Sequence, residues 1–159
     1  MSDDIFRTAV PGDEELILSF IRALAEYEHL SDQVTATPGL LHEWVFEKRL
    51  VEVIFAMDHG KEVGFALFFY NFSTFLGRPG IYLEDLFVLP EGRGRGYGKN
   101  LLKELARIAA ERGCGRLEWS CLDWNRPAIQ FYTKGMGAAP MDEWTIYRLT
   151  GDSLKAAAQ

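Results

Sequence analysis

The chain has 159 residues, of which 48% are hydrophobic and 25% charged, and this balance predicts one domain over residues 1–159 with an ordinary buried core. The formal net charge of −6 argues against nucleic acid as a partner, because binding phosphates needs a surplus of Lys and Arg. The longest apolar stretch, 65–70, is too short to cross a membrane, and the acidic first residues lack the pattern of a signal peptide.

Hydrophobic periodicity predicts the secondary structure up to residue 90. Apolar residues alternate in the expected strands and recur every three or four positions in the expected helices. The elements expected, in order, are a strand at 5–10, helices at 13–29 and 40–46, and strands at 51–57, 62–70 and 81–88. Asp58-His59-Gly60-Lys61 is expected to form a hairpin turn, and 72–79 a loop.

The second half of the chain continues the alternation of helix and strand. We expect a helix that ends near Gly113, a strand at 117–121, a short helix from Asn125, a last strand at 144–149 and a tail without core residues. The order β-α-α-β-β-β-α-β-α-β does not fit repeated parallel βαβ units or an all-β domain. It predicts an α/β (α+β) fold with a mixed central sheet flanked by helices.

A glycine-rich segment, Arg93-Gly94-Arg95-Gly96-Tyr97-Gly98, joins the strand at 81–88 to the next helix. Glycine lets backbone N–H groups approach an anion, and the start of the helix adds a positive dipole end. The segment therefore predicts a site for a phosphate-bearing cofactor, the alternative being a flexible surface turn. Its spacing fits neither a P-loop, since Asn100 follows Gly98-Lys99, nor the G-x-G-x-x-G dinucleotide motif.

A second motif runs from Asp123 to Tyr132. Asn125 is a good helix cap, Pro127 is tolerated in the first turn, and Ala128 and Tyr132 share one helix face. From the residues alone, this segment could equally be an ordinary capped helix with aromatic core residues.

The two motifs together resemble the GNAT superfamily of N-acetyltransferases. Arg93, Gly96 and Gly98 match the Arg-x-x-Gly-x-Gly pyrophosphate loop, and Asn125, Ala128 and Tyr132 match the Asn-x-x-Ala-x-x-Phe-Tyr segment that follows it. Within the superfamily, the chain is similar to the diamine (spermidine/spermine) and thialysine N-acetyltransferases. The segments that carry this likeness are 24–28, 82–88 and 124–127.

The resemblance implies the GNAT fold and acetyl-CoA as cosubstrate. The diphosphate would bind the N–H groups of 94–99, and the pantetheine arm would pair with the backbone of 86–88, where a β-bulge is the usual device for opening the strand. The implied cofactor-binding residues are Leu86, Phe87, Val88, Arg93, Gly94, Arg95, Gly96, Tyr97, Gly98, Lys99, Asn125, Pro127 and Ala128. No metal is expected, because the two cysteines and three histidines lack ligand spacing.

Two catalytic roles need residues. The acceptor amine, with a pKa of about 10.4, must lose a proton at a cost of about 4–5 kcal/mol at neutral pH, which calls for a carboxylate base. Glu84 and Asp85 are the candidates, and the resemblance selects Glu84; the alternative is a carboxylate paired with a neighbouring Arg. Tyr132 is the expected general acid for the CoA thiolate, in a direct ternary-complex transfer.

The resemblance also implies that Tyr27 and Glu28 bind the substrate together with Glu84, although a solvated helix end explains Tyr27 and Glu28 equally well. The expected activity is N-acetylation of a primary amine on a small polyamine, diamine or lysine-like amino acid. A protein N-terminus, an antibiotic amine or a non-catalytic acyl-CoA-binding module are the alternatives. We expect a cytoplasmic homodimer that uses strands 63–70 and 144–149, without a nucleic-acid or membrane partner.

Overall fold

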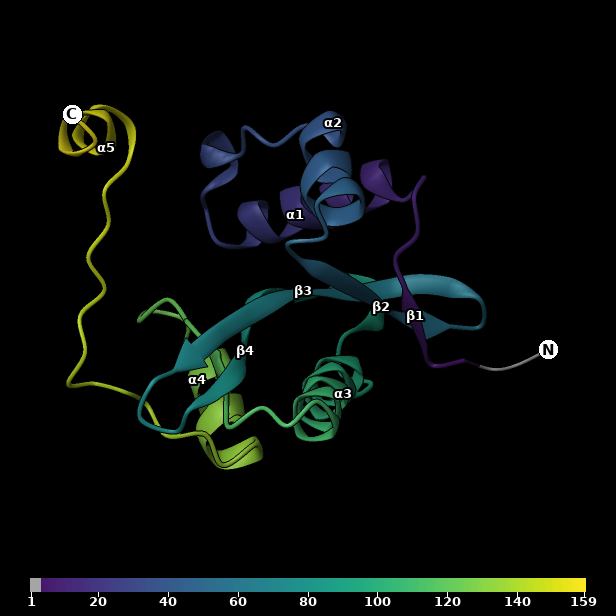
Figure 1. The fold of residues 1–159 in the computed structure, drawn as a ribbon. Helices are drawn as coiled ribbons and strands as arrows, with labels where there is room; N and C mark the ends of the chain where they lie inside the picture. The colour runs from purple at the N-terminus through teal and green to yellow at the C-terminus, as the bar shows by residue number, and fades with distance from the viewer. Residues whose placement is uncertain (1–3) are drawn as a thin grey trace. The chain divides into compact units, whose positions relative to one another are not determined.

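The structure is a computed structural model that describes residues 4–159 (Figure 1). The chain divides into two compact units, the first ending at Ser120 and the second comprising Cys121–Gln159. None of the helices described within 4–159 is long and apolar enough to span a membrane.

A mixed five-stranded sheet forms the centre of the first unit, as predicted. Its strands, in sheet order, are β1 (Phe6–Thr8), β2 (Glu52–Asp58), β3 (Lys61–Ser73), β4 (Arg78–Val88) and β5 (Leu117–Trp119). The first four strands pair antiparallel, and β5 pairs parallel to β4. The parallel pair needs a crossover, which the helix between β4 and β5 supplies.

Helices cover both faces of this sheet (Figure 1). On one face lie α1 (Glu14–Tyr27) and α2 (Pro38–Leu41), which continues as a π-helix over His42–Glu47; on the other lies α3 (Tyr97–Glu111). Short 3₁₀ turns occupy Ser31–Gln33 and Pro90–Gly92. The apolar stripe of α1 is buried, and the Phe20 ring lies 5.9 Å and 5.2 Å from the rings of Phe55 and Phe65. The core therefore holds α1 against β2 and β3.

The predicted loop at 72–79 is much shorter in the structure. β3 and β4 stay paired as far as Ser73 and Arg78, so the connection is a tight turn. Ser73 closes this turn, because its carbonyl accepts from the Gly77 N–H and its hydroxyl oxygen accepts from the Leu76 N–H. Gly77 has a φ of 65°, which glycine adopts without strain.

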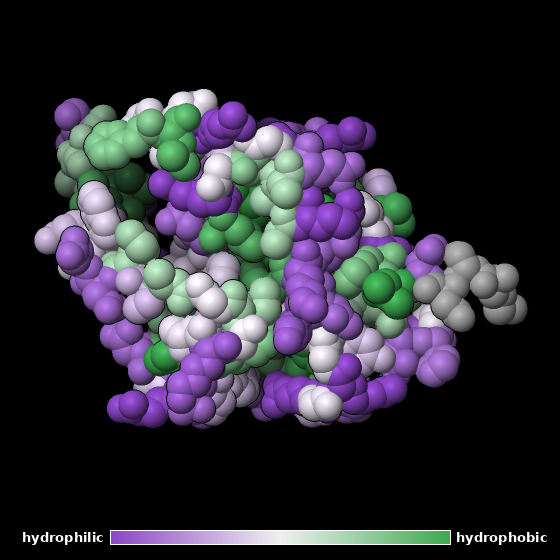
Figure 2. Space-filling model, turned by 90° about the horizontal axis from the view of Figure 1, so that it is seen from below, coloured by the Kyte–Doolittle hydropathy of each residue, from purple (hydrophilic) through white to green (hydrophobic). Residues whose placement is uncertain are grey.

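The second unit contains α4 (Arg126–Gln130), which continues as a π-helix over Phe131–Gly135, and α5 (Gly151–Ala157). The predicted strand at 144–149 is wrong: the segment is extended but forms no ladder. Trp144 and Ile146 are 76% and 73% exposed. An apolar, β-prone pattern cannot by itself provide the neighbouring strand that a ladder needs. Other hydrophobic residues also reach the surface, where they lie between hydrophilic ones (Figure 2).

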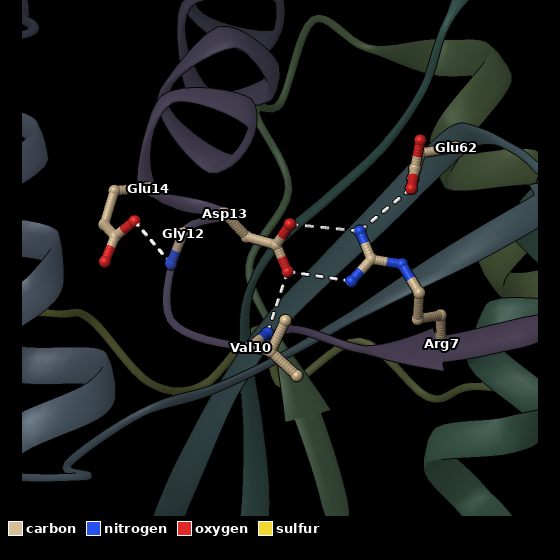
Figure 3. A network of polar contacts seen from close by, with 6 residues as sticks. All are labelled: Arg7, Val10, Gly12, Asp13, Glu14 and Glu62. Carbon is tan, nitrogen blue, oxygen red and sulfur yellow. Dashed lines mark hydrogen bonds and ion pairs between the residues drawn. The ribbon is translucent and has the colours of Figure 1, made fainter.

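A network of polar contacts joins β1, the start of α1 and β3 (Figure 3). The Arg7 guanidinium donates to both carboxylate oxygens of Asp13, at 2.8 and 3.2 Å, and to Glu62 at 2.9 Å. Asp13 also accepts from the Val10 N–H at 2.8 Å. One partly buried carboxylate therefore holds both a strand and the backbone turn that leads into α1.

We expect Asp13→Asn to lower the free energy of unfolding at pH 7 by about 1–2 kcal/mol. The hydrogen bond from Arg7 lowers the pKa of Asp13, so its contribution is present above the ordinary pKa and disappears as the pH falls through the lowered value. Urea denaturation at pH 7 and pH 3 checks this, with the exposed Asp32→Asn as control. A destabilisation of equal size at both pH values would contradict it.

Candidate active site

The strand that leads into the glycine loop carries a β-bulge, as predicted. Leu83 of β4 pairs with Phe68 and Asp85 pairs with Leu67, so Glu84 is an extra residue between two successive partners of β3. The Glu84 side chain is exposed. A bulge of this kind redirects side chains and bends the strand.

One edge of the last part of β4 is open. β5 pairs with β4 only from Ile81 to Leu83, and no other strand of the described part of the first unit borders 84–88 on that side. The two parallel strands therefore separate at the bulge. Apart from the Val88 carbonyl, which accepts from Arg93 Nε at 3.2 Å, the backbone groups along 84–88 that point away from β3 are available to pair with the amide groups of an extended ligand.

Backbone N–H groups gather in the loop that follows. Gly94 and Gly96 have φ values of 76° and 85°, and Gly96 is the N-cap of α3. A Cβ at either glycine would meet nothing within 4 Å, so the positive φ rather than crowding requires glycine there. The N–H groups of 97–99 begin a helix and have no helical acceptor. Residues 94–99 thus fit the diphosphate of a CoA ester.

The cationic side chains of the loop are less available than the sequence suggested. Arg93 turns back, since its Nε donates to the Val88 carbonyl at 3.2 Å and its guanidinium lies 5.2 Å from the rings of both Tyr27 and Phe87. Arg95 is paired with Asp58 at 2.9 Å. Lys99 is exposed and has no ion pair among residues 4–159.

Acidic side chains gather where the end of α1 meets β4. The Tyr27 ring lies 6.2 Å from the Phe87 ring, which places Tyr27 and Glu28 beside this part of the strand. Burial, together with the negative charges of Glu84 and Glu28, raises the pKa of Asp85 to about 6. Burial also raises the pKa of Glu28. Glu28 and Glu84 thus both act on Asp85, and Tyr27 contacts Phe87 two residues further along the strand.

Asp85 is a functional candidate that the sequence analysis set aside. It lies two residues before the buried Phe87, so it belongs to the face of β4 that α1 covers. The sequence signal for this role was a carboxylate at an inward position of an apolar strand. Burying such a group costs free energy, and groups with a pKa perturbed in this way cluster at functional sites.

The second unit holds the other predicted residues. Asn125 is 8% exposed and caps α4, with its side-chain oxygen accepting from the Ala128 N–H at 3.4 Å, as predicted. Pro127 lies in the first turn of that helix. Tyr132 is half-buried in the π-helix Phe131–Gly135, a form that is common at functional sites. The cofactor contacts of Asn125, Pro127 and Ala128 stay predictions, as does the acid role of Tyr132.

Residues 17–138 match the model of the acetyltransferase (GNAT) family. The chain belongs to this family, and it is an N-acetyltransferase. GNAT acetyltransferases use acetyl-CoA, which agrees with the fit of the loop to a diphosphate. Among the residues described, no group of three or more His, Cys, Asp and Glu could hold a metal ion.

Individual relatives narrow the comparison. The chain is 38% identical over 166 residues to a thialysine N-epsilon-acetyltransferase of Bos taurus, covering 97% of this chain and 96% of that protein. It is 48% identical over 93 residues to an L-ornithine N5-acetyltransferase of Arabidopsis thaliana, covering 58% of this chain and 40% of that protein. A solved integron cassette protein from the V. cholerae mobile metagenome is 32% identical with a TM-score of 0.80, covering 97% and 96%.

Proposed function

We propose that the protein transfers acetyl from acetyl-CoA to the terminal primary amine of a small lysine-like amino acid. The observation that carries this proposal is the acidic cluster of Glu28, Glu84 and Asp85. Glu84 and Asp85 lie on the strand that opens at the bulge and leads directly into the N–H-rich loop, and Glu28 caps the end of α1. A cationic acceptor would bind at these carboxylates, next to the backbone edge proposed for the acyl carrier.

The proposed chemistry assigns one task to each candidate residue. Glu84 takes the proton from the bound ammonium, directly or through water, and the negative charges of Asp85 and Glu28 hold the cation. A backbone N–H on the open edge of 86–88 polarises the thioester carbonyl. The neutral amine attacks that carbon, the adduct expels the CoA thiolate, and the Tyr132 hydroxyl protonates the sulfur. The acylated nitrogen then loses its second proton through water to the Tyr132 phenolate, which restores the hydroxyl. The transfer is direct, so no cysteine carries the acetyl group.

The raised pKa of Asp85 favours a second assignment of the base. A carboxylate with a pKa of about 6 is a stronger base than an ordinary Asp, and it is still ionised at neutral pH. Glu84→Gln and Asp85→Asn separate the two assignments, because loss of the base lowers kcat, whereas loss of a group that only binds the cation raises KM for the amine.

The names of the relatives support an amino acid as the acceptor. One is a thialysine and another an L-ornithine acetyltransferase, and both names specify an amine at the end of an amino-acid side chain. Polyamines and diamines remain the alternative within the same chemistry, since they also present a primary ammonium.

Release of CoA thiol, measured with purified protein and a panel of amines, tests the proposal. We expect kcat/KM for L-ornithine, L-lysine or thialysine to exceed that for L-norleucine by at least about 100-fold, because norleucine is L-lysine without the terminal amine. Faster turnover of spermidine would support the polyamine alternative. If the protein bound acetyl-CoA but turned over no amine, the remaining interpretation would be a non-catalytic acyl-CoA-binding module.

We also propose a homodimer. Exposed apolar side chains support it, among them Tyr70 and Phe72 at 52% and 59% and Trp144 at 76%. Of the dimer surface predicted on strand 63–70, only the end near Tyr70 is exposed, because the side chains of Val63 and 65–68 are buried in the first unit. Sedimentation equilibrium should give twice the mass of the chain, and a monomer at micromolar concentration would contradict the proposal.

A further inference from the structure

The turn between β2 and β3 contacts the glycine loop through one carboxylate. Asp58 ends β2, and the next two residues, His59 and Gly60, have φ values of 48° and 79°, which make a tight hairpin turn. Asp58 Oδ2 accepts from Arg95 Nη1 at 2.9 Å. The Asp58 side chain is 20% exposed, and that of Arg95 is 51% exposed.

The same carboxylate interacts with a second residue of the loop. The Tyr97 hydroxyl, as a hydrogen-bond donor, is the main cause of the lowered pKa of Asp58. The Arg95 guanidinium lies 5.5 Å from the centre of the Tyr97 ring, so the two side chains also contact each other. Asp58 therefore tethers the residues on either side of Gly96, the N-cap of α3.

A negative charge at this place is unexpected on electrostatic grounds. The loop fits an anionic diphosphate, and a nearby carboxylate repels such an anion. Asp58 also engages Arg95, one of the loop cations that could attract it. If charge alone determined affinity, the loop would bind the diphosphate better without Asp58.

We propose that Asp58 is a positioning residue that holds the loop at 94–99 in its anion-binding shape before acyl-CoA arrives. Gly94 and Gly96 give the loop the positive φ values it needs, but glycine also gives it many other conformations. Tethering Arg95 and Tyr97 to a tight turn of the sheet removes those alternatives in advance. The entropy of ordering the loop is then not lost on binding.

This inference rests on the proposed use of a CoA ester, and calorimetric titration with CoA tests it. Asp58→Ala should weaken CoA binding by about tenfold, whereas repulsion alone would make binding tighter. Tyr97→Phe should weaken it less, and the double variant should be no weaker than Asp58→Ala, because both changes break the same tether. Asp58→Asn keeps the shape and an acceptor for Tyr97, so a loss of a few fold is expected.

Two controls separate a loop effect from general damage. His59→Asn changes the adjacent residue, which is 91% exposed with its Nε2 3.6 Å from Asp58, and it should leave CoA affinity unchanged. Pantetheine lacks the diphosphate, so its affinity should be the same in wild type and Asp58→Ala. Unchanged or tighter CoA binding by Asp58→Ala, or an equal loss for CoA and pantetheine, would overturn the inference. A wild type that binds no CoA would instead refute the proposed function on which the inference depends.

Discussion

We expect Tyr132→Phe to lower kcat by about 100-fold while leaving KM for acetyl-CoA nearly unchanged. The variant keeps the aromatic ring and loses only the hydroxyl. A thiol has a pKa near 8.5 and a tyrosine near 10, so proton transfer to the leaving thiolate is slightly uphill and depends on a hydroxyl held at hydrogen-bond distance. Steady-state kinetics of thiol release, extended to alkaline pH, measure the effect.

Tyr147→Phe is the matched control for this experiment. Tyr147 lies in the same unit, is 91% exposed and undergoes the same chemical change. Its kcat should equal that of the wild type. If Tyr132→Phe also retained full kcat, the assignment of the acid to Tyr132 would be wrong, although the CoA loop and the acidic cluster would stand.

The second large effect concerns Asp85, whose substitution should lower the activity and raise the stability. We expect Asp85→Asn to reduce kcat/KM for the amine by at least about tenfold, because the acceptor loses a negative charge that attracts it. The same change should raise the free energy of unfolding at pH 7 by about 2 kcal/mol. The charge on Asp85 therefore attracts the acceptor and, at the same time, lowers the free energy of unfolding of the wild-type protein.

The sign of the stability change follows from the direction of the pKa shift. Burial and the charges of Glu84 and Glu28 raise the pKa of Asp85 to about 6, above its unfolded value, so the folded state binds more protons in this range. Wild-type stability should therefore fall as the pH rises from about 4 to 6, and Asp85→Asn should lack this decline. In the active enzyme, kcat/KM should rise through pH 6 as Asp85 ionises.

Urea denaturation and pH–rate profiles of both proteins measure these effects, with the exposed Asp152→Asn as control. A variant that is less stable than the wild type at pH 7 would show that Asp85 is held by favourable contacts rather than strained by burial. An unchanged kcat/KM would remove Asp85 from the acceptor site.

Local patterns predicted most of the fold. The apolar stripe that includes Phe20 predicted α1, and the glycines of the loop predicted the approach to α3, because helical period and positive φ are local properties. The strand predicted at 144–149 failed for a physical reason: its residues favour a strand, but a ladder needs a partner that no local pattern supplies. The π-helices were not predicted, since their side-chain pattern barely differs from that of an α-helix.

The candidate site was predicted in outline and missed in detail. The family resemblance selected Glu84, and the bulge that exposes it was expected. Contacts between distant segments were not: Arg93 turns onto Tyr27 rather than outward, and Asp58 reaches Arg95 from another hairpin. The raised pKa of Asp85 likewise depends on α1 covering β4. Each of these depends on tertiary packing, which sequence spacing does not specify.

The central claim is that main-chain N–H groups of 94–99 bind a diphosphate and so place the acyl group for transfer. Calorimetric titration of the wild-type protein with CoA and with pantetheine tests it most directly. The account predicts one CoA bound per chain, at least about 100-fold tighter than pantetheine, because only CoA carries the phosphates. No heat of CoA binding, or equal affinity for the two compounds, would contradict it.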